Sequence, residues 1–542
     1  MKSTLTVLFL VALLMTAPTV GFARGNAPPV DKPPAGIVPS TTTLSQVLKA
    51  HDLAVGRLTK IGDSVRTEVW QFTKAGASGS ERLVRHGTDY HSVIQTGPFS
   101  EEYGQAGDAR WHVDENGVVS DTTGSEFYSF EMFRVLEDAS DPKNDVKLLG
   151  ETQTPQPAYV VEVKIPEFKE PEWIFFDKTT ALITRTERIV EGSRLVSTYD
   201  DYVRVQGLTE PSHVHDSSGV ALLDDDYHRQ SLTFSSTVKT TEFGKPPAHV
   251  SFMRIDHAIG LNARVVNGTV VVRLMVNNRG LDFELSSGDA HSYMDWDVAR
   301  ELNLPTFGQV IQTAGKQVSY ETQIAEATTG DLHLQNFALE VLPFYYHPSY
   351  DTKVVGVLGY DFLSQGFITV DYVNGRVSAS PNTAAAVDAA DLDVIPVWFD
   401  DGLPFFTTTI GSHETKNVLL DSSFDVSFVL GSFCQAYPEA VIDDGGKQHG
   451  REVVPFADSG GYGREVDIWL AKLPQLHVGP MNFIDYKIMA TNMEMDQGNH
   501  AIDAVMGTGF LIFFDVSYDF AHDRVLLKRN AYFKKWFKVT RT

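Results

Sequence analysis

An internal repeat links two stretches in the second half of this chain. The stretches GVLGYDFLSQGFITVDYVNGRV (356–377) and AVMGTGFLIFFDVSYDFAHDRV (504–525) align without gaps at an offset of 148 residues. In each, two apolar residues precede a glycine, Gly359 or Gly507, and an acidic–aromatic pair follows twelve residues later. Self-similarity of this kind predicts two copies of one structural unit.

A second correspondence lies upstream of the first. LDFELSSG (281–288) matches KNVLLDSSF (416–424), which places Ser286 opposite Asp421. Each copy then reaches its apolar–apolar–glycine motif 73 or 86 residues later. Around these motifs, β-branched runs and an Asn-Gly turn at Asn267-Gly268 predict strands and hairpins. The order of the two correspondences favours duplication of a β unit.

Each unit resembles a retropepsin-like aspartic peptidase domain, in which an Asp-Thr/Ser-Gly triplet follows an apolar strand and an apolar–apolar–glycine motif comes later. The resemblance covers 255–380 and 394–535, joined by a linker at 381–393. It implies a mainly β fold of two pepsin-type β-barrel lobes with a cleft between them. Exported bacterial proteins of this type often carry an N-terminal β domain before the repeats.

The family's chemistry needs two carboxylates about 3 Å apart that share one proton. Here Asp421 supplies one, and Ser286 stands where the other belongs; a hydroxyl cannot replace a carboxylate base. The resemblance assigns loop support to the neighbouring residues Ser287, Gly288, Ser422 and Ser423. We therefore predict an incomplete catalytic pair and a protein that binds polypeptide with little or no hydrolysis.

An active endopeptidase is the first alternative, with Asp421 and an unidentified partner. Asp289 and Asp282 are the nearest acids to Ser286, and Asp289 is the better candidate, although a solvated turn aspartate is expected there. His291 lies five residues from Ser286, but no serine–histidine–aspartate arrangement can be derived from the sequence.

Two glycine-containing stretches suit flap hairpins over the cleft. ADSGGYGREV (457–466) holds Gly460, Gly461 and Tyr462, and QTAGKQV (312–318) holds Gly315. Flaps of this kind would cover an extended peptide bound by strand addition.

The N-terminal part has a different pattern. Residues 1–23 read as a signal peptide, with Lys2, an apolar stretch and small residues before a cleavage point, and 24–40 form a Pro-rich linker. Helical spacing at 41–56 puts Leu44, Val47, Leu48 and Leu53 on one side, and short strands follow to about 240. Region 41–240 resembles the lipoprotein-carrier type of curved sheet, so a second alternative is an apolar-ligand carrier.

Charge and localisation follow from the same reading. The net charge of -25 argues against nucleic acid as a partner. After removal of the signal no segment is long and apolar enough to span a membrane. We expect an exported bacterial protein, periplasmic or secreted.

We expect no cofactor and no metal. His213 and His215 share a strand face beside Asp216, but exposed strand histidines explain them without an ion. Cys434, the single cysteine, lies in an apolar context and is expected to be a structural thiol.

Overall fold

The computed structural model describes residues 33–537 with internal gaps. The gaps are 57–63, 75–76, 123–134, 137–138, 140–143, 165–170, 191–192, 218, 220–223, 238–239, 249–251, 308–310, 314–315, 319, 343–352, 383–390, 445–449, 455–463 and 498–499. The predicted signal peptide, most of the Pro-rich linker and the flap residues Gly315, Gly460, Gly461 and Tyr462 lie outside the described residues.

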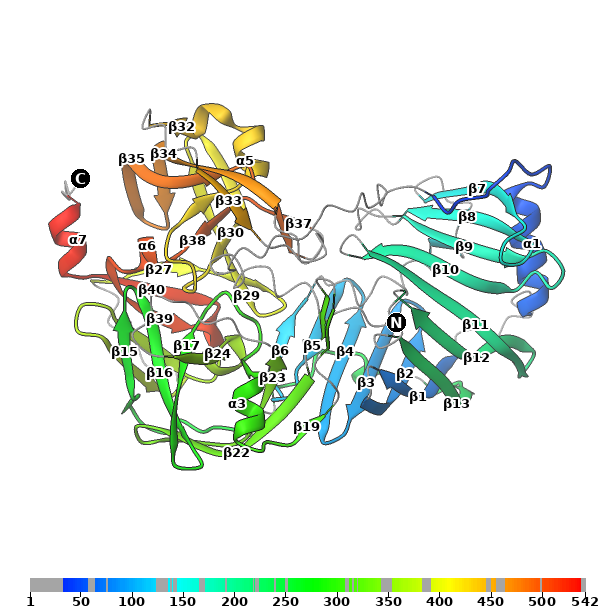
Figure 1. The fold of residues 1–542 in the computed structure, drawn as a ribbon, viewed down its shortest axis with the longest axis horizontal. Coiled ribbons are helices and arrows are strands. Elements are labelled where there is room, and N and C mark those ends of the chain that lie inside the picture. The colour runs from blue at the N-terminus through cyan, green and yellow to red at the C-terminus, as the bar shows by residue number, and fades with distance from the viewer. Residues whose placement is uncertain are drawn as a thin grey trace.

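The N-terminal part is one antiparallel sheet with a helix packed on it (Figure 1). The helix α1 (Leu44–Val55) begins at a capping box between Thr43 and Gln46 and ends at Gly56, whose φ is 82°. Its buried residues are Val47, His51 and Val55, whereas Leu53 is 61% exposed, so the predicted apolar side is shifted around the helix. The strands are β1 (Val65–Lys74), β2 (Ala77–His86), β3 (Asp89–Thr96), β4 (Phe99–Ala106), β5 (Ala109–Val113), β6 (Val119–Asp121), β7 (Asp145–Thr152), β8 (Ala158–Lys164), β9 (Glu172–Asp177), β10 (Ile183–Val190), β11 (Ser193–Val205), β12 (Leu208–Ser217) and β13 (Asp225–Ser235).

Two lobes follow, and their strands are hydrogen-bonded in the same order. Lobe 1 runs β15-β16-β17-β24-β18-β23-β22 and lobe 2 runs β28-β29-β30-β38-β31-β35-β34. An extra pairing, β16 with β22 or β29 with β34, closes each sheet towards a barrel. The mainly β fold class with barrel-type lobes is therefore confirmed, and the equal strand order is what duplication predicts.

The bounds of the lobe elements are as follows. Lobe 1 contains β15 (Ala263–Val266), β16 (Thr269–Val276), β17 (Arg279–Leu285), β18 (Tyr293–Asp295), α3 (Trp296–Glu301), β19 (Thr306–Phe307), β20 (Ile311–Thr313), β21 (Lys316–Val318), β22 (Tyr320–Thr329), β23 (Leu332–Leu342), β24 (Val354–Leu358) and α4 (Tyr360–Leu363). Lobe 2 contains β28 (Trp398–Asp400), β29 (Leu403–Ile410), β30 (His413–Leu420), β31 (Phe428–Val429), α5 (Gly431–Ala436), β32 (Ile442–Asp443), β33 (Gly450–Val454), β34 (Arg464–Val478), β35 (Met481–Thr491), β36 (Met495–Gln497), β37 (His500–Ile502), β38 (Ala504–Met506), α6 (Thr508–Leu511) and α7 (Ala531–Trp536).

A six-stranded sheet joins the lobes. Its order is β14-β26-β25-β39-β40-β27, formed by β14 (Ile259–Gly260), β25 (Phe367–Asp371), β26 (Arg376–Ser380), β27 (Asp393–Pro396), β39 (Phe514–Asp519) and β40 (Arg524–Arg529). Thr369 pairs with Ser517 across the middle, and their hydroxyls lie 2.9 Å apart. These two residues are separated by the repeat offset of 148. An antiparallel pair that joins equivalent residues lies on a local two-fold axis, so this pair marks the axis between the lobes.

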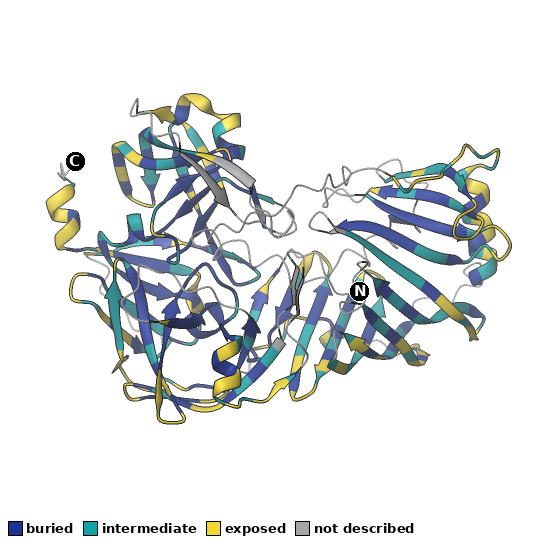
Figure 2. Cartoon of the chain, in the orientation of Figure 1, coloured by how far each residue is buried: buried dark blue, intermediate teal, exposed yellow. Residues whose placement is uncertain are grey.

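Burial follows the strands of both lobes, and exposed residues gather on α3, α7 and the turns (Figure 2). The innermost strands are the ones that carry the repeat motifs: every residue of β24 is buried. No helix in the described part of the chain is long and apolar enough to cross a membrane.

The N-terminal sheet docks on lobe 1 through the turn between β5 and β6. Asp114 holds that turn, since its Oδ1 accepts hydrogen bonds from the backbone N–H groups of Asn116 and Val118 at 2.9 and 2.8 Å. The Asn116 amide then donates to the Ala338 carbonyl at 3.0 Å and accepts from the Ala338 N–H at 2.9 Å. Val118 joins the main hydrophobic core of the lobes.

We predict that Asn116→Ala lowers the free energy of unfolding by about 1–3 kcal/mol, because the buried polar groups of Ala338 lose their partners. Chemical denaturation measures the change. The matched control is Asn482→Ala, at an exposed strand position, where a change within about 0.5 kcal/mol is expected. Equal effects of the two substitutions would contradict the docking role of Asn116.

Candidate functional site

Two buried loops meet at the local two-fold axis, one from each lobe. Each loop leaves a strand that runs parallel to the strand of the repeat motif: β17 beside β24, and β30 beside β38. The Ser286 N–H donates to the Leu358 carbonyl at 3.0 Å, and the Asp421 N–H donates to the Met506 carbonyl at 3.1 Å. Ser286 and Asp421 thus occupy equivalent places, and both side chains are fully buried.

The loops are held together by a reciprocal set of hydrogen bonds between Ser287 and Ser422. The Ser287 N–H donates to the Ser422 hydroxyl at 3.0 Å, and the Ser422 N–H donates to the Ser287 hydroxyl at 3.1 Å. Each hydroxyl also donates across the axis, from Ser287 to the Leu420 carbonyl (2.9 Å) and from Ser422 to the Leu285 carbonyl (3.2 Å). This brace fixes the separation of the two loops.

Gly359 and Gly507 pack closely against the backbone of the same loops. Each begins a short helix, α4 or α6, and each N–H donates to a serine hydroxyl, Ser292 at 3.0 Å or Ser427 at 3.1 Å. A Cβ at Gly359 would lie 2.6 Å from the Asp289 carbonyl oxygen, and one at Gly507 would lie 2.4 Å from that of Phe424. The loop backbone therefore approaches too closely for any side chain.

Asp421 presents one carboxylate oxygen without a hydrogen bond. Its Oδ1 accepts from the Ser423 hydroxyl at 2.6 Å and from the Ser423 N–H at 2.8 Å, while Oδ2 has no partner among the described residues. Burial raises the pKa of Asp421 from 3.8 to about 6, against the opposing effect of the Ser423 hydrogen bonds. Such a group is a weak acid poised near neutral pH.

Asp289 is the second acid at this site, and the expectation of a solvated turn aspartate was wrong. It is 4% exposed, and its Oδ2 has no partner among the described residues. Burial, followed by the charge of Asp421, raises the pKa of Asp289 from 3.8 to about 7, and a hydrogen bond from Ser286 opposes the rise. In lobe 2 the equivalent position, which also receives the first N–H of the short helix, is Phe424.

Asp361 is a functional candidate that the sequence reasoning missed. It is 1% exposed, accepts from the Ser292 hydroxyl at 2.5 Å, and accepts from the Asn116 amide at 3.1 Å. It therefore connects the loop of lobe 1 to the docked N-terminal turn. The only sequence signal is its place two residues after Gly359, where lobe 2 has Gly509.

The remaining candidate residues have other partners or surroundings. Asp282 is paired with Arg273 (2.7 Å) and Arg264 (2.8 Å), so it is not a free acid. His291 lies against Asp114 at 3.9 Å. Cys434 is half-buried, and burial raises the pKa of its thiol to about 11.

His213 and His215 of the N-terminal sheet contact a different carboxylate from Asp216, which the sequence places beside them. His213 and His215 both contact Asp226, at 3.1 and 3.2 Å, rather than Asp216. His228 stacks on His213 with ring centroids 4.5 Å apart.

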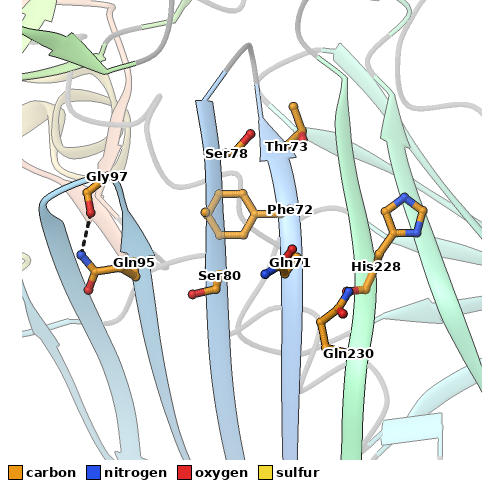
Figure 3. Close-up of a pocket in the computed structure, with 10 residues that line it drawn as sticks. Gln71, Phe72, Thr73, Ser78, Ser80, Gln95, Gly97, His228 and Gln230 are labelled. Atoms are coloured by element: carbon orange, nitrogen blue, oxygen red, sulfur yellow. Dashed lines mark hydrogen bonds between the residues drawn. The ribbon is translucent and has the colours of Figure 1, made fainter.

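A hollow on the N-terminal sheet has a mostly polar lining (Figure 3). Its volume is about 550 Å³. Around Phe72 it presents the side chains of Gln71, Thr73, Ser78, Ser80, Gln95, His228 and Gln230. Sites that hold apolar ligands are lined mainly by apolar side chains, so this hollow does not favour an apolar cargo.

Comparison with known proteins identifies lobe 1. Residues 272–362 match a family model described as aspartyl protease, and this range includes Ser286, Gly288 and Gly359. Residues 272–362 of lobe 1 are therefore similar to an aspartyl protease domain, as the resemblance of the first copy predicts. No curated protein matches the sequence.

The similar solved structures include three that each have low sequence identity to this chain. Basic 7S globulin from soybean is 12% identical, with a TM-score of 0.32, over 53% of this chain and 98% of that one. A LolA superfamily protein from Nitrosomonas europaea is 11% identical, with a TM-score of 0.29, over 38% of this chain and 99% of that one. A putative outer membrane lipoprotein-sorting protein domain from Vibrio parahaemolyticus is 13% identical, with a TM-score of 0.27, over 37% of this chain and 95% of that one.

The first prediction for the site concerns Gly288. A Cβ there would lie 1.9 Å from the Asp421 Cγ, and Ser423 holds that carboxylate in place. Gly288→Ala should therefore lower the free energy of unfolding by about 1–3 kcal/mol. Gly260→Ala is the control, since nothing lies within 4 Å of its added Cβ. A neutral Gly288→Ala would show that the loops are not tightly packed.

The second prediction for the site concerns the pH dependence of folding stability. Because the folded-state pKa values of Asp289 and Asp421 are raised, the folded protein holds protons between about pH 4 and 7 that the unfolded chain releases. Stability from these groups is complete at low pH and is lost as pH rises through their folded pKa values. Asp289→Asn should flatten this decline in the melting temperature between pH 4 and 7. The exposed Asp485→Asn should leave it unchanged, and equal slopes in all three proteins would refute the assignment.

Proposed function

We propose that this protein binds polypeptide between two aspartyl-protease-type lobes and hydrolyses it little or not at all. One observation carries the proposal: Ser286 occupies the place equivalent to Asp421, with the same hydrogen bond to the strand of the repeat motif. The site thus holds a hydroxyl where the reaction needs a carboxylate.

The chemical consequence is a missing proton acceptor. In the family reaction one carboxylate takes a proton from the attacking water while the other, protonated, hydrogen-bonds to the substrate carbonyl. A serine hydroxyl can donate a hydrogen bond, but it does not ionise at acidic or neutral pH. Loss of a general acid–base group costs about 10²–10⁴ in rate.

Burial supports the same proposal. Ser286 and Asp421 have no exposed surface and Asp289 has 4%, so in this conformation water and substrate do not reach the carboxylates. The brace between Ser287 and Ser422 nevertheless keeps the inter-lobe architecture of a peptidase intact. A fold kept in this way without a complete acid pair suits binding rather than turnover.

The signal-like residues 1–23 support export, and we propose that the protein works in the periplasm or outside the cell. Unfolded or extended polypeptide is the ligand class that this location and the lobe architecture suit. An apolar cargo on the N-terminal sheet is less well supported, because most of the side chains that line the hollow there are polar.

A specific observation favours a second candidate function, acid-range hydrolysis by Asp289 and Asp421. Both carboxylates are buried, each has an oxygen without a partner among the described residues, and the charge of Asp421 acts on Asp289. Two carboxyls that repel each other in a buried site share protons, as the family's pair does. In this second candidate function, Asp289 supplies the carboxyl that the family has at the position of Ser286. Ser286 supplies a hydroxyl that hydrogen-bonds to Asp289.

One assay separates the two functions. A fluorescently labelled, unfolded protein is incubated with the full chain from pH 3 to 8, and binding is followed by anisotropy and cleavage by gel electrophoresis. We expect binding without cleavage for the natural sequence. The double substitution Ser286→Asp with Asp289→Ser keeps the net charge and returns the carboxyl to the place opposite Asp421, so it should gain cleavage with an acid optimum.

The outcomes are distinct. Acid cleavage by the natural sequence that disappears in both Asp289→Asn and Asp421→Asn would overturn the first proposal and establish the second. Cleavage lost only in Asp421→Asn would refute both, because a different partner would then be acting. Failure of the natural sequence to bind any unfolded protein would end the binding proposal.

A further inference from the structure

Three side chains from three parts of the fold converge next to the candidate site. His112 lies on β5 of the N-terminal sheet, His291 on the loop of lobe 1 that follows Gly288, and Asp401 on the turn between β28 and β29 of lobe 2. One ligand atom of each lies within 4.8 Å of the others. Two imidazoles and a carboxylate are the donor set that zinc and related divalent transition ions take in proteins.

The first of these imidazoles is built into the fold. His112 is 5% exposed and stacks on Tyr103, with ring centroids 4.4 Å apart at 10°. Its Nδ1 lies 3.4 Å from the Asp401 Oδ1, and its Nε2 is buried without a partner among the described residues.

The other two ligands are also held in place. The Asp401 N–H donates to the Asp121 carbonyl of β6 at 2.7 Å, which ties the turn of lobe 2 to the N-terminal sheet. His291 lies with its ring 5.8 Å from that of His112 and its Nδ1 3.9 Å from the Asp114 Oδ2. Asp114 uses its Oδ1 for the β5–β6 turn, which leaves its Oδ2 at the edge of the cluster.

The place where the N-terminal sheet meets the two lobes also has an excess of buried carboxyl groups. Asp114 and Asp361 are both buried, and both accept hydrogen bonds from Asn116, Asp114 from its backbone N–H and Asp361 from its side-chain amide. A dication placed among these carboxyls would offset their repulsion.

We propose that His112, His291 and Asp401 bind one divalent transition ion of the zinc type, which links the N-terminal sheet to both lobes. This site is independent of polypeptide binding and of hydrolysis. Zinc bonds of about 2.0–2.1 Å in tetrahedral geometry place ligand atoms about 3.3 Å apart, and the His112–Asp401 distance of 3.4 Å already fits. The remaining ligand, His291, lies within the 4.8 Å limit and needs a shift of about 1.5 Å or less to meet that geometry.

The test measures metal directly. The full chain is stripped with a chelator, incubated with micromolar Zn²⁺, desalted, and its zinc content measured by mass spectrometry. We expect one zinc per chain and a melting temperature that rises with zinc and falls with chelator, because an ion bound only by the folded state stabilises it. Titration with Co²⁺ should give the visible absorption of a tetrahedral nitrogen–oxygen site.

The variants are His291→Gln and Asp401→Asn, both of which retain size, and Asn tolerates the positive φ of 51° at position 401. Each should weaken zinc binding by about 100-fold or more, since loss of even an outer partner costs about 10–100-fold. His213→Ala is the matched control. It removes the histidine shared by two other clusters, His213–Asp226–His228 and Asp200–Asp201–His213, and should keep the zinc.

Three results would overturn the proposal. They are no zinc retained by the natural sequence, zinc retained equally by His291→Gln and Asp401→Asn, or zinc lost in His213→Ala. If His291→Gln and Asp401→Asn fail to fold, the natural sequence and His213→Ala still test for the zinc site. The measurements are then the zinc content, the Co²⁺ spectrum and the thermal shift.

Discussion

The arrangement of both lobes depends on the reciprocal hydrogen bonds between Ser287 and Ser422. Each hydroxyl is used twice, as acceptor for the opposite N–H and as donor to the opposite strand. Because these groups are buried, breaking one bond leaves polar atoms without water or partner, at about 1–3 kcal/mol each. The brace thus sets where Asp421 and Ser286 lie. The Thr369–Ser517 pair also joins equivalent residues of the two repeat copies.

The sequence predicted the parts of the fold that local pattern controls. The glycine motifs, the polar triplets and the Asn267-Gly268 hairpin all lie where strand ends and turns were expected, since positive φ at both hairpin residues suits Asn and Gly. The helix at the start was also predicted, but its buried face includes His51, which bonds to the Ala181 carbonyl at 2.9 Å. Hydrophobicity alone selected Leu53 instead, because a polar residue with a tertiary partner is invisible to a periodicity argument.

The site residues that were missed share one physical cause. Asp289 was expected to face solvent, and Asp361 was not considered, because loop side chains are directed by contacts that come from far along the chain. Asp361 receives its hydrogen bond from Asn116, 245 residues away, and His112, His291 and Asp401 come from three separate sheets or loops. No spacing rule connects such residues, whereas Ser286 and Asp421 are connected by the repeat itself.

The two lobes share one strand order but differ in the side chains around the candidate site. At the two places where lobe 1 has Asp289 and Asp361, lobe 2 has Phe424 and Gly509. Asp361 binds the docked turn of the N-terminal sheet, and Asp289 takes the hydrogen bond of Ser286. Lobe 1 thus has buried carboxyls at two places where lobe 2 has none, whereas lobe 2 has the carboxyl of Asp421 where lobe 1 has Ser286. A third carboxyl at position 286 would add repulsion to a site already holding Asp289 and Asp421 at raised pKa. A serine at 286 avoids this repulsion and supplies a hydrogen bond to Asp289.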